Sequence, residues 1–321
     1  RVLMRIDAFK ATDFTSLEKH WNRIPWEFYL PPDATPQLRV SCRKSRLYHS
    51  DAVAQRLQAA LAQYFDTFAS TDGLPGAADL DSPPPLLFVR LLHDRCTVSV
   101  DSSGEALYRR GIKMQVTEAP LRENLAAAIL MLAGYDGRQT LMDPMCGSGT
   151  FSIEAAMMAA DIPAGWYRPF AFFAWPAYHL NQGRWVHLRR QAQIRFRVPE
   201  RPQIFASDID PEACGMLSAN LTGIEPAPAV AINVADFFSI RPVGDTGVVV
   251  LNPPYGRRID AGREGHLYRE IGEKLQKDFR NWTAAVIIPD RQLLREIPFA
   301  ARVYPLVHGG LKVWVAIGKV Q

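Results

Sequence analysis

A run of four apolar residues that ends at two consecutive prolines constrains this chain more than any other stretch. Residues 248–256 read Val-Val-Val-Leu-Asn-Pro-Pro-Tyr-Gly. Three β-branched residues and a leucine without a polar interruption are typical of a strand buried in a parallel sheet, and the prolines end that strand. Because open α/β sheets bind ligands at the carboxyl ends of their strands, we expect a binding site at residues 252–255. An amide oxygen, fixed carbonyls and an aromatic face suit a planar base that carries an exocyclic amino group.

From about residue 118 onward, predicted strands and helices alternate, which is the pattern of a parallel sheet with helices on its faces. We predict helices at 121–132, 150–160, 211–221 and 267–279, and strands at 140–142, 204–207, 230–233, 248–252, 284–288, near 303 and at 313–317. Residues 162–202 interrupt the alternation and are rich in Trp, Phe and Arg. We expect them to form an insertion packed beside the sheet, with Trp166, Arg168, Trp175 and Trp185 serving packing rather than base stacking.

The first part of the chain, residues 1–117, has a different pattern. Strand periodicity occurs at 2–8, 37–44, 86–92 and 96–101, and amphipathic helix periodicity at 17–21 and about 50–68. Residues 71–85 are rich in Gly, Pro and Asp and are predicted to form a loop. This part therefore reads as a small α+β domain.

Composition excludes some classes of protein and favours others only weakly. The 37 Lys and Arg residues exceed the 33 Asp and Glu residues, giving a net charge of +4, which leans towards polyanionic partners. No run of about 18 apolar residues is present, so a membrane span is not expected. The four cysteines are widely separated and form no Cys-x-x-Cys pair, which argues against a zinc site or a disulfide framework and is consistent with a reducing cytoplasm.

Residues 143–150, Asp-Pro-Met-Cys-Gly-Ser-Gly-Thr, follow a short predicted strand and begin a predicted helix. Gly147 and Gly149 would allow the backbone to approach a ligand closely, and the free N–H groups of a helix start favour a polar group. A plain strand-to-helix turn is the alternative. The chain has no Gly-x-Gly-x-x-Gly and no Gly-Lys-Ser/Thr motif here, so dinucleotide and triphosphate binding are disfavoured.

Acidic residues also follow the next two predicted strands. Asp208 is placed to accept the hydroxyls of a ribose, whereas Asp210, before Pro211, is interpreted as a helix N-cap. Asp236 could meet an adenine amino group with Phe237 against the ring, although a solvated loop aspartate is the alternative. Together with Asp143 and Asn252, these side chains end four successive strands, which favours one shared site.

The densest basic cluster of the first domain lies around residue 44. It could neutralise RNA phosphates without reading sequence, or it could be an ordinary solvated face. The predicted RNA-binding residues are Arg39, Arg43, Lys44, Arg46, Tyr48, His49 and, after the Asn-Pro-Pro-Tyr motif, Arg257.

Several of these motifs resemble those of a known family. Asp-Pro-Met-Cys-Gly-Ser-Gly-Thr-Phe (143–151), Ser-Asp-Ile-Asp (207–210) and Asn-Pro-Pro-Tyr-Gly (252–256) resemble class I S-adenosylmethionine-dependent methyltransferases that modify exocyclic amino groups. Residues 107–112, 119–128 and 153–165 are similar to bacterial large-subunit ribosomal RNA guanine-N2 methyltransferases that carry a THUMP domain, and residues 44–50 to the signature of that RNA-binding domain. The likeness covers almost the whole chain.

The resemblance implies a Rossmann-like class I domain with a seven-stranded, mostly parallel sheet at 118–321, preceded by a small THUMP domain within 1–117. By the same resemblance, we expect residues 1–11 to be the last strand of a ferredoxin-like segment whose earlier part this sequence does not include. The resemblance implies S-adenosyl-L-methionine as cofactor and no metal. The predicted cofactor-binding residues are Pro120, Leu121, Asp143, Met145, Cys146, Gly147, Ser148, Gly149, Thr150, Asp208, Ile209, Asp236, Phe237 and Asn252, and the predicted catalytic residues are Asn252, Pro253, Pro254 and Tyr255.

The expected function is methylation of a guanine N2 amino group in RNA, most simply large-subunit ribosomal RNA, in the cytoplasm. Adenine-N6 methylation of DNA or RNA stays open, because Asn-Pro-Pro-Tyr serves both amino groups. Transfer RNA guanine-N2 methylation and a non-catalytic RNA-binding protein are further alternatives.

Overall fold

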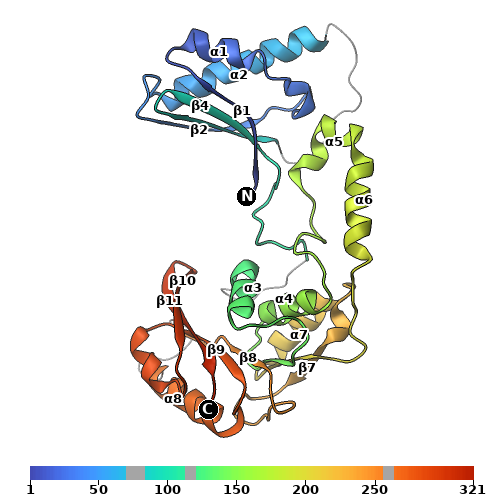
Figure 1. Cartoon of the computed structure of the whole chain (residues 1–321), viewed down its shortest axis with the longest axis vertical. Helices are drawn as coiled ribbons and strands as arrows, with labels where there is room; N and C mark the ends of the chain where they lie inside the picture. Colours follow the sequence, from blue (N-terminus) through green and yellow to red (C-terminus); the bar gives the residue numbers. More distant parts are fainter. Residues whose placement is uncertain (70–83, 113–120, 256–263) are drawn as a thin grey trace. The chain divides into compact units, whose positions relative to one another are not determined.

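The computed structural model describes residues 1–69, 84–112, 121–255 and 264–321 (Figure 1). They form two compact units, each considered by itself. The first unit consists of Arg1–Leu107 together with Arg168–Arg189, and the second of Tyr108–Tyr167 together with Arg190–Gln321. No helix among the described residues is both long and apolar enough to cross a membrane.

A four-stranded sheet with the order β1-β4-β3-β2 forms the centre of the first unit. Strands β2 and β3 are parallel, and the other neighbours are antiparallel. The elements are β1 (Leu3–Lys10), α1 (Phe14–Trp21), the 3-10 helix η1 (Trp26–Phe28), β2 (Gln37–Arg43), α2 (Ser50–Ala69), β3 (Leu86–Leu92) and β4 (Arg95–Asp101). Helices α1 and α2 lie over one face of the sheet, where Leu17, Trp21, Leu57 and Val89 are at most 1% exposed (Figure 1). The predicted strands and helices of this region are confirmed.

Residues 168–189 complete the first unit, which the sequence did not predict. They comprise the 3-10 helix η2 (Ala171–Ala174), α5 (Pro176–Leu180) and the first part of α6 (Gln182–Gln193). The Trp175 ring is buried against Tyr29, edge to face, with centroids 5.9 Å apart. The buried Arg168 guanidinium donates to the carbonyl oxygens of Ser103, Glu105 and Ala106 at 2.8–3.0 Å. The expectation that 162–202 packs beside the parallel sheet as one block therefore fails for its middle part, although its aromatic residues do serve packing.

The second unit is built on a seven-stranded sheet with the order β10-β11-β9-β8-β5-β6-β7. Strands β9, β8, β5, β6 and β7 are parallel neighbours, and β11 runs antiparallel to both β9 and β10. The strands are β5 (Leu141–Asp143), β6 (Ile204–Asp208), β7 (Val230–Val234), β8 (Val248–Leu251), β9 (Thr283–Ile288), β10 (Arg302–His308) and β11 (Leu311–Lys319). The predicted mostly parallel α/β sheet is confirmed.

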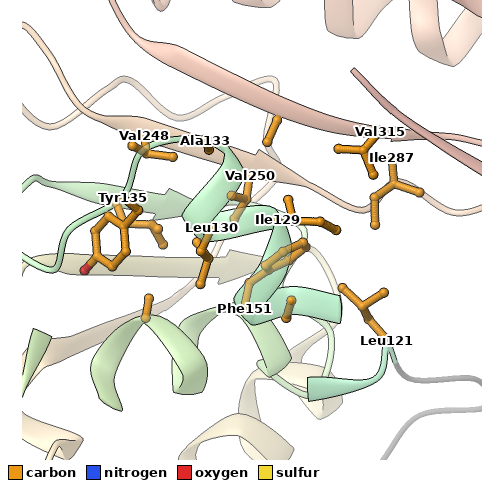
Figure 2. Packing of buried hydrophobic residues seen from close by; sticks show 14 of the residues in the cluster. Leu121, Ile129, Leu130, Ala133, Tyr135, Phe151, Val248, Val250, Ile287 and Val315 are labelled. Carbon is orange, nitrogen blue, oxygen red and sulfur yellow. The ribbon is translucent and has the colours of Figure 1, made fainter. Parts of the chain in front are cut away.

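Both faces of this sheet are covered by helices. The helices are α3 (Glu123–Leu132), α4 (Thr150–Ala159), α7 (Pro211–Leu221) and α8 (Glu264–Asp278). Along β8, Val248 and Val250 pack with α3 and α4, as Figure 2 shows, while Val249 and Leu251 pack with α8. All four side chains are at most 2% exposed, which explains why the run has no polar alternation. Each such burial contributes about 1.5–3 kcal/mol to stability.

Candidate active site

The order of the strands places a crevice beside β5. From β5 the chain proceeds to β6 and β7 on one side, and it then returns to β8 on the other side of β5. The loops that follow β5 and β8 therefore diverge at the point where the direction of winding reverses. Ligands of open α/β sheets bind at such a point.

A cavity of about 690 Å³ lies there, within the second unit. This volume is in the range of cofactor pockets, roughly 300–1,000 Å³. Its described lining residues are Leu121, Pro144, Met145, Cys146, Gly147, Ser148, Thr150, Phe151, Asp208, Ile209, Asp210, Ala213, Asp236, Phe237, Phe238, Asn252, Pro254 and Leu267. Loops after four successive parallel strands thus contribute to one cavity, as the sequence predicted.

The loop after β5 forms one wall, and its two glycines have different tasks. Gly149 precedes α4 with φ of +86°, and a Cβ atom at this position would lie 2.1 Å from Cδ1 of Leu217. Gly147, with φ of +52°, lines the cavity, and a Cβ there would meet no described atom within 4 Å. Gly149 is therefore required for backbone conformation and packing, whereas Gly147 leaves the backbone open towards a ligand.

Asp208, at the end of β6, holds this loop in place. Its Oδ2 atom accepts from the backbone N–H of Gly147 at 2.9 Å, and its Oδ1 atom accepts from that of Asp210 at 3.1 Å. An ionised carboxylate has about four acceptor sites, so Asp208 can still accept from a ligand hydroxyl. Asp210 caps α7 by accepting from the N–H of Glu212 at 2.9 Å, which confirms its predicted role as N-cap.

Asp143 does not line the cavity. It is 1% exposed, and its Oδ2 atom accepts from the backbone N–H and the hydroxyl of Ser152 at 3.2 and 2.7 Å. Its Oδ1 atom has no hydrogen-bond partner among the described residues. Burial, reinforced by the charge of Asp208, raises the pKa of Asp143 from 3.8 to about 7, against the hydrogen bonds from Ser152. Asp143 therefore anchors β5 to α4 from behind the loop. The prediction that its side chain contacts the cofactor is not supported by this position.

Cys146 lines the cavity as a neutral thiol. Burial raises the pKa of this thiol well above its usual value, and the charges of Asp143 and Asp208 act in the same direction. Since the thiolate is the reactive form, the environment does not favour a cysteine nucleophile.

The loop after β7 contributes a carboxylate and two aromatic rings. Asp236 lines the cavity, and its Oδ1 atom accepts from the N–H of Phe238 at 3.0 Å. Phe237 is only 1% exposed and packs towards Phe279, with ring centroids 5.9 Å apart. Phe238 is 36% exposed and also lines the cavity. Phe238, the more accessible ring, was not among the predicted residues, although its position after Asp236 could have indicated it.

Asn252 and Pro254 form the wall that follows β8. The Asn252 Oδ1 atom is buried and has no hydrogen-bond partner in the part of the chain that the structure describes. Leaving a buried acceptor unpaired costs about 1–3 kcal/mol, so this atom favours a ligand that donates to it. Pro253 is buried and does not line the cavity.

Tyr255 turns towards the sheet instead of the cavity. It is 8% exposed and belongs to the hydrophobic cluster on the α3 and α4 side, and its ring meets that of His308 edge to face at 6.4 Å. His308, at the end of β10, is a neighbour that the sequence did not suggest, because this contact joins distant segments. Other lining residues absent from the prediction are Pro144, Phe151, Asp210, Ala213 and Leu267. Of the predicted site residues, Pro120 and Arg257 lie outside the described residues.

Apart from Arg257, the predicted RNA-binding residues lie in the first unit, on β2 and in the loop that follows it. The loop is fixed to the turn between β3 and β4, because Asp94 accepts from the Arg46 N–H at 2.7 Å and Ser45 accepts from the Asp94 N–H at 3.0 Å. Tyr48 is 68% exposed, with His49 beside it at 4.1 Å between ring centroids. The remaining members, Arg39, Arg43 and Lys44, have exposed side chains.

The cavity fits a nucleoside cofactor such as S-adenosyl-L-methionine. Asp208 and Asp236 can accept from ribose and adenine groups, and Gly147 leaves its backbone accessible. The unpaired Asn252 oxygen, at the opposite wall, remains for a second ligand.

Comparison with known proteins yields two family matches. Residues 110–303 match the model of the RMKL-like methyltransferase domain, and residues 11–101 match that of the THUMP domain. The chain is 35% identical over 321 residues to the ribosomal RNA large subunit methyltransferase K/L of Methylococcus capsulatus, covering 97% of this chain and 43% of that relative. It thus spans less than half of that protein.

Two further similarities extend over more of the compared protein. A Synechocystis relative, whose name proposes an RNA methyltransferase, is 32% identical and matches 97% of this chain and 80% of its own length. The solved structure of SMU.472, complexed with SAH, superposes with a TM-score of 0.80 at 27% identity and covers 100% of this chain and 84% of that one. The class I methyltransferase fold that the resemblance implied is confirmed.

Proposed function

The chain belongs to the RMKL-like methyltransferase family and carries a THUMP domain, and from this premise we propose that it methylates the N2 amino group of a guanine in RNA, with large-subunit ribosomal RNA as substrate. S-Adenosyl-L-methionine is the cofactor of this family, and its sulfonium supplies an electrophilic methyl group when bound. The substrate is taken from the name of the Methylococcus relative and from the presence of the THUMP domain.

The cofactor would be held by the loops after β5, β6 and β7. We assign the ribose hydroxyls to Asp208, whose carboxylate is already oriented by two backbone N–H groups. Asp236 is assigned to the adenine amino group, with the exposed ring of Phe238 beside the base. Gly147 would admit the cofactor to the backbone of the loop.

The unpaired Oδ1 atom of Asn252 is the single observation that carries the assignment to an amino group. The lone pair of an exocyclic amine is delocalised into the base, so the nitrogen is a poor nucleophile. If Asn252 Oδ1 accepts one of its N–H bonds, the nitrogen can pyramidalise and direct its lone pair at the methyl carbon. Such positioning can supply roughly 7–11 kcal/mol of the barrier.

The base must leave its stack to reach Asn252. Tyr255 follows Pro254 directly, and only 8% of its surface is exposed. We propose that this ring, held against the sheet by the surrounding cluster and by His308, supports Pro254 from behind and does not form an open stacking platform.

The test is to incubate the protein with labelled S-adenosyl-L-methionine and separate pools of ribosomal RNA, transfer RNA and DNA, and to identify the methylated nucleoside by mass spectrometry. We expect N2-methylguanosine in large-subunit ribosomal RNA. N6-methyladenine in any pool would replace this proposal by the adenine alternative, and label confined to transfer RNA would reassign the substrate.

Asn233→Ala is the matched control for a substitution of Asn252 by alanine, because Asn233 is exposed on β7 of the same sheet and does not line the cavity. It should methylate as well as the wild type.

A wild-type protein that binds RNA but labels none of the pools would support the non-catalytic alternative.

A further inference from the structure

Within the described part of the chain, helices cover one face of the four-stranded sheet of the first unit and not the other. Leu87, Val89 and Leu91 of β3 and Cys96 and Val98 of β4 point to the helices and are at most 1% exposed. Because successive side chains of a strand alternate between faces, the intervening residues must point to the opposite face. These positions do not belong to the core of the unit.

The strand register gathers basic side chains on this uncovered face. In one row across the sheet, Lys10 of β1 lies opposite Arg95 of β4, Arg95 lies opposite Leu92 of β3, and Leu92 lies beside Arg43 of β2. All three cationic side chains of this row are exposed. Equivalent rows add further cations, and the complete set, here called the basic face, is Arg5, Lys10, Arg39, Arg43, Arg90 and Arg95.

Among the residues that the structure describes, negative charge does not balance the basic face. None of its six members forms an ion pair with a described residue, whereas on the helical side Arg56 pairs with Glu18 at 2.9 Å. The carboxylate at an outward strand position, Asp101, is 2% exposed and is held by Arg1 and by the Ser103 N–H. Moreover, like charges directly opposite each other, such as Lys10 and Arg95, destabilise a sheet. Both properties suit a surface that meets an anionic partner.

We infer that the basic face binds the sugar-phosphate backbone of RNA; this rests on the proposed function, which makes RNA the substrate. Five of the six cations are arginines, whose planar fork can donate two hydrogen bonds to one phosphate. The six cations are spread over four strands. This arrangement does not match the side-chain spacing of a single peptide, whereas a continuous polyanion can contact cations on successive strands. The face also continues into the loop of Lys44 and Arg46, which Ser45 and Asp94 hold against the β3–β4 turn. It thus extends the predicted cluster across the sheet.

The test uses the full chain and a fluorescent fragment of large-subunit ribosomal RNA, with binding measured by anisotropy between 50 and 200 mM KCl. The double variant Arg90→Gln/Arg95→Gln should bind at least tenfold more weakly at low salt. Its slope of log affinity against log salt should be less steep by about 2, because each lost phosphate contact removes about 1. Both side chains are exposed, so the variant should fold, and its melting curve and cofactor affinity should match the wild type.

The matched control is Lys19→Gln/Arg23→Gln, which removes two exposed charges from α1 and the turn that follows it. It should leave affinity and slope unchanged. If the Arg90→Gln/Arg95→Gln variant binds like the wild type while the wild type methylates RNA, the inference fails and the proposed function stands. If that variant loses binding while the wild type methylates no RNA, the basic face stands and the proposed function fails. Absence of RNA binding by the wild type would contradict both.

Discussion

The two sheets of this molecule leave different surfaces available to ligands. The seven-stranded sheet is buried on both faces, by α3, α4 and α7 on one side and by α8 on the other, so its loops at the strand ends form the cavity. The four-stranded sheet is buried on one face, and its other face carries exposed basic side chains. The faces that helices cover thus decide whether a sheet offers a ligand the loops at its strand ends or an open face.

The polar groups of the two regions also differ in their solvation. At the strand ends, Asp143 and Asn252 each have a buried oxygen atom without a described hydrogen-bond partner. The electrostatic interactions of such desolvated groups should be strong and short in range. The arginines of the basic face are solvated, and salt should screen them. We therefore expect large, specific effects of mutations in the cavity and graded, salt-dependent effects on the basic face.

Asn252→Ala should have the largest effect. Removal of the acceptor oxygen should lower methyl transfer by roughly 10²- to 10³-fold, because positioning of the amino group is lost. Cofactor affinity, measured by calorimetry, should change less than about threefold, since the cofactor is assigned to other loops. Turnover close to that of the wild type would refute the role of Asn252.

Gly149→Ala tests whether the cavity loop depends on a backbone that only glycine adopts easily. With φ of +86° and the added Cβ 2.1 Å from Leu217, the substitution should lower the free energy of unfolding by about 2–3 kcal/mol. Gly215→Ala is the matched control, because that helical glycine has open space around it, and it should stabilise by about 0.5–1 kcal/mol. Urea denaturation measures both, and equal effects would contradict the packing argument.

Asp208→Ala should weaken cofactor binding by about 10- to 100-fold, because charge-assisted hydrogen bonds are worth roughly 1.5–3 kcal/mol. Asp245→Ala removes an exposed carboxylate from the loop between β7 and β8 and should leave binding unchanged. Unaltered affinity of Asp208→Ala in calorimetry would remove the ribose assignment.

Asp143 should produce a smaller, pH-dependent effect on stability. Its folded-state pKa, about 7, lies above its ordinary value of 3.8, so the folded state binds the proton more tightly. This stabilisation is complete below the unfolded pKa and is lost as the pH rises through 7. Between pH 6 and 8 the wild type should lose about 1 kcal/mol more unfolding free energy than Asp143→Asn, measured with urea. Parallel pH profiles would show that Asp143 is not the responsible group.

The sequence predicted the shared strand edge because local rules suffice for it. An apolar run followed by a polar residue identifies a strand end, and parallel neighbours end at the same edge, so Asp208, Asp236 and Asn252 meet in one cavity. The side of the loop that Asp143 faces could not be predicted, because it depends on the Ser152 hydroxyl in the following helix. Tyr255 faces the sheet through its contact with His308, which is equally non-local.

The remaining misses also come from tertiary pairing. Residues 168–189 were placed beside the wrong sheet, since periodicity does not reveal that Trp175 packs against Tyr29 of the first unit. Arg90 lay in a correctly predicted strand, whereas Arg95, one residue before the predicted strand 96–101, is the first residue of β4. Whether Arg90 and Arg95 belong to a basic face nevertheless depends on the register of four strands. In this sheet β1 pairs with β4, and β2 with β3, across long stretches of the sequence.

The most direct test compares kcat and the KM for RNA between Asn252→Ala and Arg90→Gln/Arg95→Gln on the same ribosomal RNA fragment. If the strand ends perform the transfer and the basic face binds the RNA, the first variant should lower kcat by roughly 10²-fold or more with little change in KM. The second should raise KM about tenfold or more at low salt and leave kcat within about twofold. A loss of kcat in both variants, or a raised KM in both, would contradict this division between the two sheets.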